Sequence, residues 1–513
     1  MTFQRFLCIV FSLALLSAPT LAGTLFDDFK LSGTFESQYW NHDPNDWTDG
    51  EDPVYEGPYT SWENILGLNL DWRSYFAEVR LRSMQYTDPI HYDPRSREHE
   101  TDFELFKFAA GYRGEWLKVT GGDFYKSYGR GLVLFVQEDK ELNLDRSIRG
   151  GSVDLTTRWI DFNIFGGDIR WHLFKDLLSS MTIEDFNIKD RAVGARAVGH
   201  LPFNMNLGAS YVAVKQYEII RDKYEDEDLA LGSVDFQIAG LFDGMLDLYT
   251  EYAELKWDSE EPFGEDLDDG KALYSSITLY AGPVTILGEY KDYDFWASRY
   301  SRPPTADRDD EIAETDDIRG PRIRVDYFLA STDTLFYVSG SRFDNHAHET
   351  SFGSVFRNRI DHLYGGIEQK WDNLYAHVTY GYKKYVTLDE IHRRITSDIE
   401  YTIVGNHSIN LYYEYKFTGN PGAEKDEHKS YLTYSISPFL SVTAHYSKHI
   451  IQQTGKNRTE DEWIAGEIST TPIPALTLMV VYGKLPPGLI CSGGQCRIAP
   501  EFEGIQASLS YRF

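Results

Sequence analysis

The last ten residues of the chain, Gly504 to Phe513, alternate between apolar and polar side chains without interruption. The apolar positions are Ile505, Ala507, Leu509, Tyr511 and Phe513. Because successive side chains of a β-strand point to opposite faces, this stretch is expected to be a strand with one apolar and one polar face. Such a strand suits the closing strand of a membrane β-barrel, whose apolar face meets lipid and whose polar face lines the lumen.

The first residues, 1–22, have the pattern of a secretory signal peptide. One basic residue, Arg5, precedes an apolar run from Phe6 to Leu16, and small residues follow up to Ala22. The run is too short for a membrane-spanning helix, which needs about 20 apolar residues. We therefore expect cleavage before Gly23, export of the mature chain, and a single barrel domain over residues 23–513.

The mature sequence offers no comparably long apolar run, so membrane crossing would fall to strands. Lipid has no partner for an open sheet edge, and strands can cross it only as a closed barrel. The 35 Tyr and 11 Trp residues would supply the aromatic girdles of such a barrel. A secreted, aromatic-rich β-sandwich would have the same composition, so composition alone does not decide between the two folds.

The order of turns favours the barrel. Tight polar breaks alternate with longer polar stretches, and segments of alternating polarity lie between them. The breaks are Arg73-Ser74, Gly114-Glu115, Arg158-Trp159, Leu201-Pro202, Asp243-Gly244, Gly282-Pro283, Thr332-Asp333, Asp372-Asn373, Asn406-His407, Pro438 and Ile473-Pro474. The longer stretches include residues 217–228, 387–393, 419–429 and 449–461. This order predicts an all-β, antiparallel transmembrane barrel of about 24 strands (roughly 22 to 26), with short periplasmic turns and long acidic extracellular loops.

The chain is strongly acidic, with a formal net charge of −30. The acidic residues gather in the expected outer loops, at Asp43 to Glu56, Asp222 to Asp228, Asp258 to Asp269 and Asp307 to Asp317. This charge excludes nucleic acid as a natural partner. Divalent cations at these loops are a candidate partner, because hard cations prefer carboxylate oxygen. Solvation of surface loops explains the same clusters. No metal or cofactor site can be assigned from the sequence.

Two cysteines of the mature chain, Cys491 and Cys496, lie in the loop before the last strand. They flank a short spacer that contains two glycines, and the periplasm is oxidising, so we expect a disulfide rather than free thiols. A zinc site would need a second ligand pair nearby, which the sequence does not supply.

The stretch from Gly121 to Gly151 breaks the alternation at a place where an outer loop is expected. Leu132 to Val136 are continuously apolar, and a cluster of charges of both signs surrounds them. One interpretation lays this segment against the inner wall, with Gly129 and Gly131 allowing a tight bend or a close backbone approach. Its charges would then select solutes at a constriction. They include Arg130, Glu138, Asp139, Asp145 and Arg149. The other interpretation is a long strand pair above the membrane, with the glycines at a bulge.

The same stretch resembles the signature of a bacterial family of unknown function, whose members are predicted outer-membrane barrels. The residues that carry the resemblance are Asp123, Tyr125, Gly129, Gly131, Leu132, Glu138, Asp139, Leu142, Asp145 and Gly150. The C-terminal pattern, with Tyr511 and Phe513, resembles the terminal strand that the barrel-insertion machinery reads in bacterial outer-membrane proteins. The resemblance implies a barrel in the cell outer membrane, surrounded by its lipid. It implies no substrate or activity.

Catalytic motifs are not evident in the sequence, so we do not expect an enzyme. The strand histidines are His362, His377 and His445. Asp361 is next to His362 but would point to the opposite face of the strand. A closed ring of this size leaves a lumen that is either water-filled or obstructed. We therefore expect a porin-like channel or transporter for an unidentified polar solute. The alternatives are a plugged barrel with a structural or interaction role and an outer-membrane hydrolase.

Overall fold

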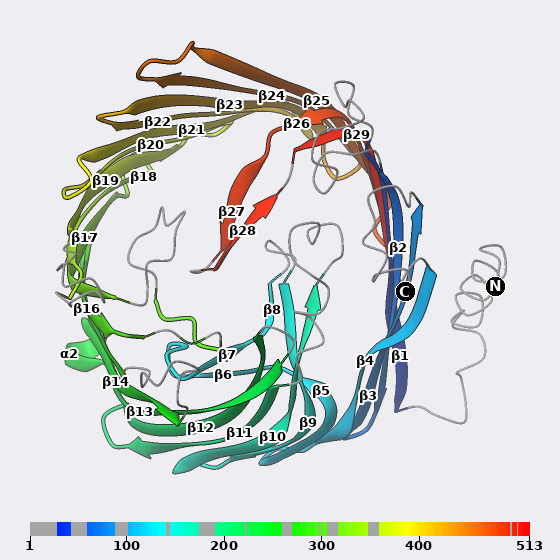
Figure 1. The fold of residues 1–513 in the computed structure, drawn as a ribbon, viewed down its shortest axis with the longest axis vertical. Helices are drawn as coiled ribbons and strands as arrows, with labels where there is room; N and C mark the ends of the chain where they lie inside the picture. Colours follow the sequence, from blue (N-terminus) through cyan, green and yellow to red (C-terminus); the bar gives the residue numbers. More distant parts are fainter. Residues whose placement is uncertain are drawn as a thin grey trace.

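The computed structural model describes residues 28–42, 59–87, 101–139, 144–173, 190–220, 223–258, 269–296, 298, 300–304, 317–346, 359–492, 495–499 and 501–513. Within these ranges, 24 antiparallel strands pair in order and close into a ring (Figure 1). The all-β expectation and the strand count are confirmed. No helix in the described part of the chain is long and apolar enough to cross a membrane.

The strands of the ring follow one another along the chain. They are β1 (Phe29–His42), β2 (Tyr59–Trp72), β3 (Tyr75–Thr87), β4 (Thr101–Arg113), β5 (Leu117–Phe124), β9 (Leu144–Thr156), β10 (Ile160–Leu173), β11 (Asp190–Leu201), β12 (Met205–Ile220), β13 (Lys223–Gly240), β14 (Leu246–Asp258), β15 (Gly270–Ala281), β16 (Val284–Asp294), β17 (Ile318–Leu329), β18 (Thr334–Asp344), β19 (Arg359–Lys370), β20 (Leu374–Tyr385), β21 (Glu390–Val404), β22 (His407–Asn420), β23 (Ala423–Ile436), β24 (Leu440–Gln453), β25 (Thr459–Ile473), β26 (Leu476–Leu485) and β29 (Phe502–Arg512). The remaining elements are β6 (Lys126–Tyr128), β7 (Leu134–Val136), β8 (Glu138–Asp139), β27 (Gly488–Ser492), β28 (Gln495–Ala499) and the short helix α2 (Leu241–Gly244).

The barrel closes between the last strand and the first. β29 pairs with β1 from Arg512 opposite Thr34 to Gly504 opposite His42. Phe513 adds two backbone hydrogen bonds with Gly33, of 2.8 and 3.0 Å. A Cβ on Gly33 would come within 2.5 Å of the Phe513 ring, so this ring lies directly over the glycine. The alternating C-terminal stretch is therefore the closing strand of the barrel.

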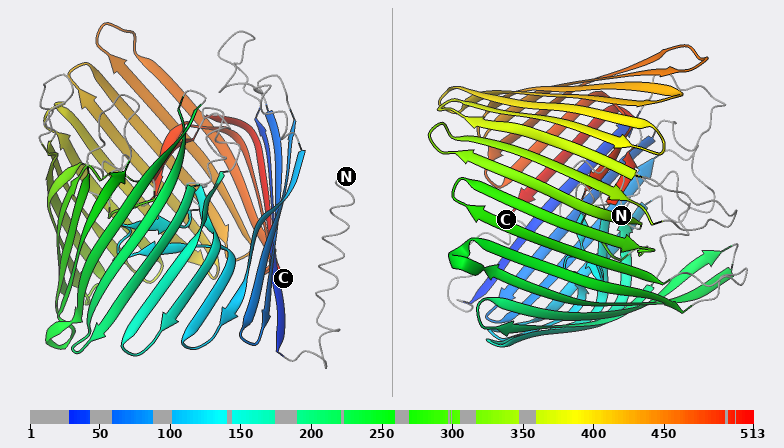
Figure 2. Two further views of the ribbon diagram at one scale, coloured as in Figure 1. Left: turned by 60° about the horizontal axis from the view of Figure 1, so that its bottom comes forward. Right: turned by 90° about the vertical axis from the view of Figure 1, so that its left-hand side faces the viewer.

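Each predicted tight break falls at a junction between two consecutive strands of the ring. Several outer stretches expected as loops are instead the ends of long hairpins. Ile220 pairs with Lys223, and Asn420 pairs with Ala423. The sequence hides these strand ends because charged and polar residues interrupt the apolar alternation of a membrane strand there. Figure 2 shows the strands tilted around the barrel, with hairpins of different height.

The outer face of the ring is apolar. Large apolar side chains are exposed on strand after strand, among them Val119, Ile164, Tyr211, Val234, Tyr252, Ile277, Ile323, Val338, Leu363 and Leu411. Along β17, Ile323 is exposed, while its neighbour Arg322 bonds Glu289 on the inner face. A closed ring with an apolar outer band is the form in which strands can occupy lipid. The chain is thus a β-barrel of the cell outer membrane.

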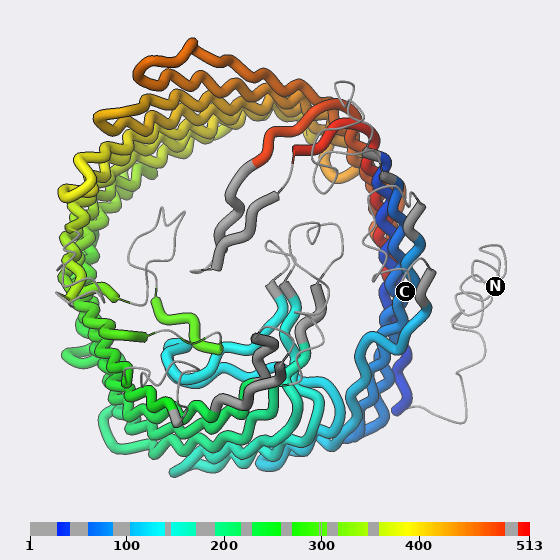
Figure 3. The backbone as a smooth tube through the Cα atoms, in the orientation of Figure 1, coloured from blue at the N-terminus to red at the C-terminus, as the bar shows by residue number. Residues whose placement is uncertain are grey.

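The buried apolar core lies inside the ring and on one side of it. The chain leaves the wall after Phe124, and β6 and β7 pair as a hairpin within the ring, beside β10 to β14 (Figures 1 and 3). We call residues 126–136 the inner hairpin. Its apolar side chains form one cluster with residues after β16 and with inward side chains of β10 to β18. The cluster includes Leu132, Val133, Leu134, Ile169, Val212, Leu231, Tyr293, Trp296 and Tyr300.

Three expectations fall outside the described residues. They are the signal peptide over residues 1–22, most of the acidic clusters in the outer loops, and Leu142 of the motif. These expectations stay predictions.

Candidate functional site

Polar contacts fix the first strand of the inner hairpin to the wall. Lys126 Nζ lies 2.5 Å from Asp154 Oδ1 on β9, and the Tyr128 hydroxyl donates to Asn163 Oδ1 on β10. Burial raises the pKa of the Tyr128 phenol, and the Asp154 carboxylate raises it further. The phenol therefore remains a neutral hydrogen-bond donor.

The bend of the inner hairpin approaches the wall so closely that it requires glycine. Gly129 has a φ of 56°, and a Cβ there would overlap the carboxylate of Glu251 on β14. Glu251 Oε2 accepts hydrogen bonds from the Arg130 backbone N–H at 2.8 Å and from the Tyr249 hydroxyl at 2.6 Å. These donors are needed because a buried carboxylate without partners is costly. The exposed Arg130 guanidinium stacks over the Tyr249 ring, 4.8 Å from its centroid.

A second glycine of the bend contacts the segment after β16. Gly131 has a φ of 85°, and a Cβ there would lie 2.5 Å from the Arg302 carbonyl oxygen. The Arg302 N–H donates to the Gly131 carbonyl at 2.8 Å, and the Phe135 N–H donates to the Tyr300 carbonyl at 2.7 Å. Residues 300–302 thus supply backbone partners to a hairpin that has left the wall.

The apolar run explains why the hairpin lies inward. Leu132, Val133, Leu134 and Val136 are each 0% exposed. Part of the wall under them is apolar on both faces: on β12, Tyr211 is exposed outside while Val212 and Val214 are buried inside. A membrane strand whose inner side faces water alternates between apolar and polar side chains. Consecutive apolar residues such as 211–214 therefore indicate that the inner face is covered.

β5 lies between β4 and β9 and pairs with both of them. Where β5 turns into the lumen, the backbone pairing that joins β4 to β9 is interrupted. β4 pairs with β5 only from Ala109 to Arg113, whereas β9 pairs with β5 up to Phe124. Beyond these pairs, residues 101–108 of β4 and 144–149 of β9 face each other without a backbone pairing to one another in the described structure, because β9 pairs there with β5 and, at Leu144 and Asp145, with β8. We call this stretch the β4–β9 seam. Lipid cannot supply partners to backbone groups that such an interruption leaves open.

Asp123 and Arg149 provide partners at the seam. The Phe108 N–H donates to Asp123 Oδ2 at 3.0 Å, and Arg149 Nη2 donates to the Phe106 carbonyl at 3.1 Å. Arg149 Nη2 also lies 2.8 Å from Asp123 Oδ2. Two charged residues of the stretch thus replace part of a missing strand pairing.

A second ion pair crosses the seam closer to the outer loops. Lys107 of β4 pairs with Asp145 of β9, and the Tyr125 hydroxyl contacts both side chains. Glu138 of β8 lies 3.4 Å from Arg80 Nη1 on β3. Sequence reasoning did not single out Lys107 or Arg80, because their partners become neighbours only when β5 leaves the wall.

The remaining predicted residues have separate positions. A Cβ on Gly150 would overlap the Gly166 backbone, whereas one on Gly121 would have only the Ala110 carbonyl oxygen at 3.9 Å. Asp139 pairs with Leu144 where β8 meets β9. Cys491 and Cys496 lie directly opposite each other in β27 and β28, and their disulfide remains a prediction.

Across the lumen, the inner face of β20 to β25 is polar and aromatic. Tyr412 and Tyr431 stack with ring centroids 5.4 Å apart, and His445 meets Tyr431 edge-on at 4.8 Å. These residues alternate with Leu411 and Leu432, which are exposed on the outer face. The inner faces on the two sides of the ring therefore differ in chemistry.

Of the three predicted histidines, His445 meets a carboxylate, with its Nε2 3.5 Å from Glu467 Oε2. Asp361 accepts hydrogen bonds from Arg342 Nε at 2.7 Å and Arg359 Nη2 at 2.8 Å, while His362 is buried against the Tyr364 ring. His377 Nε2 lies 2.8 Å from the Tyr337 hydroxyl.

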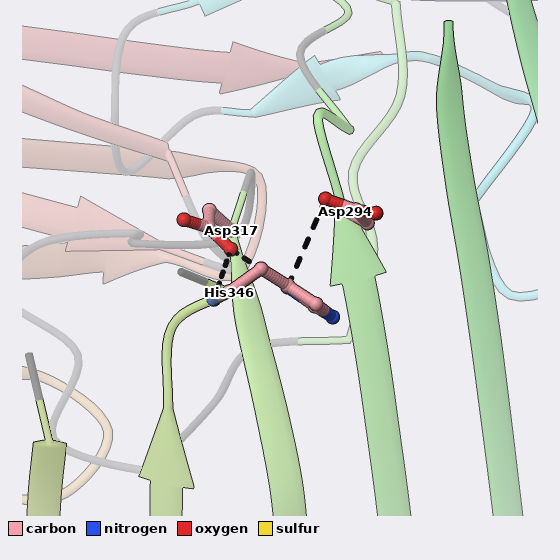
Figure 4. A group of neighbouring side chains, drawn as sticks. All are labelled: Asp294, Asp317 and His346. Atoms are coloured by element: carbon pink, nitrogen blue, oxygen red, sulfur yellow. Dashed lines mark hydrogen bonds and ion pairs between the residues drawn. The ribbon is translucent and has the colours of Figure 1, made fainter. Parts of the chain in front are cut away.

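A cluster of metal-ligand type lies elsewhere, at the outer ends of β16, β17 and β18. His346 Nδ1 is 2.8 Å from Asp317 Oδ1 and 3.9 Å from Asp294 Oδ1 (Figure 4). Its Nε2 is 2.9 Å from Asp292 Oδ1. Imidazole nitrogen and carboxylate oxygen are ligands that zinc accepts in proteins. Sequence reasoning missed this cluster, because strand pairing rather than sequence spacing brings its members together.

Solved structures share the fold at low sequence identity. The siderophore receptor PirA from Pseudomonas aeruginosa matches with a TM-score of 0.50 and 9% identity, over 96% of this chain and 81% of that chain. A mutant of the ferric enterobactin receptor PfeA from Pseudomonas aeruginosa matches with a TM-score of 0.51 and 9% identity, over 94% and 80%. At such identity the likeness shows the barrel fold alone. No curated protein matches the sequence.

The family of the chain is shown by its sequence. A family described as being of unknown function, DUF6029, matches residues 3–314 and 356–513. The match includes the whole stretch from Gly121 to Gly151 and the closing strand, so the expected resemblance is confirmed. The chain belongs to the family of unknown function DUF6029.

Proposed function

We propose that the protein is an outer-membrane channel or transporter, and that a polar solute passes between the inner hairpin and the inner face of β20 to β25. The contrast between the two inner faces carries this proposal. The face of β10 to β15 is buried under the hairpin, whereas the opposite face presents Tyr412, Tyr431 and His445. Polar groups are stable where water reaches them, and a wet inner face offers a solute a path.

The charges of the inner face favour a neutral or zwitterionic solute. Arg394 pairs with Glu414 at 2.7 Å, and Lys416 pairs with Glu427 at 3.6 Å. Paired charges produce little field of one sign, so this wall would attract neither anions nor cations strongly. The stacked tyrosine rings add apolar faces with hydroxyl groups at their ends, which suit polar organic molecules.

The alternative is a plugged barrel that serves a structural or interaction role. The inner hairpin supports this alternative, because it fills one side of the lumen with buried side chains. A hydrolase has less support, since two of the structurally similar proteins are receptors by name and Asp361 is bound by arginines.

Solute flux into liposomes separates the candidates. Liposomes that contain the protein should take up neutral sugars and zwitterionic amino acids faster than empty ones. Glu414→Gln should move the reversal potential toward anions, because it removes one negative charge from the inner wall. Glu462→Gln is the matched control, since Glu462 pairs with Lys448 at an exposed site. Liposomes that stay impermeable to ions and small solutes would favour the plugged barrel.

A further inference from the structure

We propose that Asp294, Asp317 and His346 bind a divalent transition-metal ion at the outer rim of the barrel, with Asp292 orienting the imidazole. β16 ends at Asp294, β17 begins directly after Asp317, and His346 follows the end of β18. These three strands are neighbours in the ring. The strand pairing therefore fixes the backbone positions of all the proposed ligands.

The hydrogen bonds of His346 leave one ring nitrogen facing two carboxylates. Asp292 Oδ1 lies 2.9 Å from Nε2 and accepts a hydrogen bond in the tautomer that carries the proton on Nε2. In that tautomer Nδ1 carries a lone pair, yet Nδ1 lies 2.8 Å from Asp317 Oδ1 and 3.9 Å from Asp294 Oδ1. A lone pair and carboxylate oxygens repel each other unless a positive charge lies between them. Either a second ring proton or a metal ion supplies that charge.

The contact between Asp292 and His346 Nε2 is one that metal-bound histidines commonly make. A metal-bound histidine commonly donates its other ring N–H to a carboxylate, which fixes the orientation of the ring. Asp292 stands in that position. The proposed ligand atoms lie within 4.8 Å of one another, and ligands of a tetrahedral zinc ion are about 3.4 Å apart. The distance from His346 Nδ1 to Asp294 Oδ1, 3.9 Å, would have to shorten and that to Asp317 Oδ1, 2.8 Å, would have to lengthen.

The ligand set also indicates the class of ion. Calcium and magnesium take oxygen ligands, whereas imidazole suits zinc, copper, iron and nickel. The side chains of His346 and Asp317 are 16% and 29% exposed, so solvent can deliver an ion to them. One imidazole and two carboxylates leave a further coordination position for water or for a group of another molecule.

An ion at this position would tie the rim to the inner hairpin. Asp294 and Asp317 flank the segment that contains Tyr300 and Arg302, and these two residues hydrogen-bond the hairpin at Phe135 and Gly131. The ion would therefore join both ends of the segment that supports the hairpin. A metal ion here would therefore affect the inner hairpin as well as the rim, which an isolated surface carboxylate would not do.

Calorimetric titration of the full-length protein with Zn²⁺ tests the proposal. The protein is refolded in detergent, stripped with chelator and titrated in the absence of other metals. We expect one ion per chain, bound at least about tenfold more weakly by His346→Ala and Asp317→Asn. His392→Ala is the matched control, because His392 has one carboxylate, Glu390, 2.6 Å from its Nε2. This variant should bind Zn²⁺ as the parent does.

Cobalt gives a second readout. Bound Co²⁺ should show visible absorption bands in the parent, and these bands should be lost in His346→Ala. Heat-modifiable migration in gels shows whether each variant is folded, and Asp294→Asn replaces His346→Ala if the latter does not fold. A parent that binds no Zn²⁺, or a folded variant that binds it as tightly as the parent, would overturn the proposal.

Discussion

Arg149 of β9 and Asp123 of β5 form a bidentate ion pair, with Arg149 Nε 3.0 Å from Asp123 Oδ1 and Nη2 2.8 Å from Oδ2. The Asp123 side chain is 3% exposed and that of Arg149 is 20% exposed. A two-pronged contact of this kind fixes geometry as well as charge. Because both side chains also bond the backbone of β4, the pair closes the wall where β5 turns inward.

Replacing Arg149 should destabilise the barrel strongly. Arg149→Leu would leave the Asp123 carboxylate buried without its partner, which costs about 3 to 5 kcal/mol. Urea titration of the protein in lipid vesicles, followed by tryptophan fluorescence, measures the change in the free energy of unfolding. Arg73→Leu is the control, since the Arg73 and Asp28 side chains are 69% and 54% exposed and such pairs contribute at most about 1 kcal/mol. Equal losses would show that the seam does not determine stability.

Gly131→Val should loosen the inner hairpin. Its φ of 85° suits glycine, and a side chain would meet the Arg302 carbonyl oxygen. Strain of this type costs about 1 to 3 kcal/mol, so the hairpin should detach more often and single-channel conductance should rise. Gly121→Ala belongs to the same stretch but has room for a Cβ, and it should conduct like the parent. An unchanged conductance for Gly131→Val would mean that the hairpin does not limit the path.

Arg130→Ala should move ion selectivity toward cations. The Arg130 guanidinium is exposed and stacks on Tyr249, so its charge faces the lumen. Arg149 was expected to act in the same way, but its charge is compensated by Asp123. Reversal potentials in a salt gradient should therefore shift for Arg130→Ala and stay near the parent value for the double variant Arg149→Gln, Asp123→Asn, which loses both charges of the pair. A larger shift for the double variant would contradict this division of roles.

The sequence is sufficient for the ring but not for its interior. The alternation with a period of two predicts the strands, the tight polar breaks predict the turns, and the stretch ending at Phe513 predicts the closure. Each of these patterns involves residues that are close together in the sequence. The close contacts at Gly129 and Gly131 can also be predicted from the sequence, because only glycine tolerates such an approach. By contrast, Glu251, Lys107 and His346 acquire their partners through strands that are distant in sequence. One chain carries no signal for such contacts, apart from the unbroken apolar runs on the covered wall.

Cys491 and Cys496 should form a disulfide in the exported protein. They lie directly opposite each other in a two-stranded hairpin, and the periplasm keeps such pairs oxidised. Thiol alkylation followed by intact mass measurement should detect two free thiols only after reduction. Alkylation of both residues without reductant would contradict the prediction.

The closing contact should govern insertion into the outer membrane. Phe513 bonds Gly33 through its backbone, and its ring covers that glycine and stacks on Tyr511 at 5.9 Å. Deletion of Phe513 removes the backbone bonds and the ring, whereas Phe513→Ala removes only the ring and Phe513→Tyr keeps both. The outer-membrane fraction, measured by immunoblot after membrane separation, should therefore fall most for the deletion, less for alanine and little for tyrosine. If all three variants reach the membrane at the parent level, neither the closing contact nor the terminal aromatic residue controls assembly.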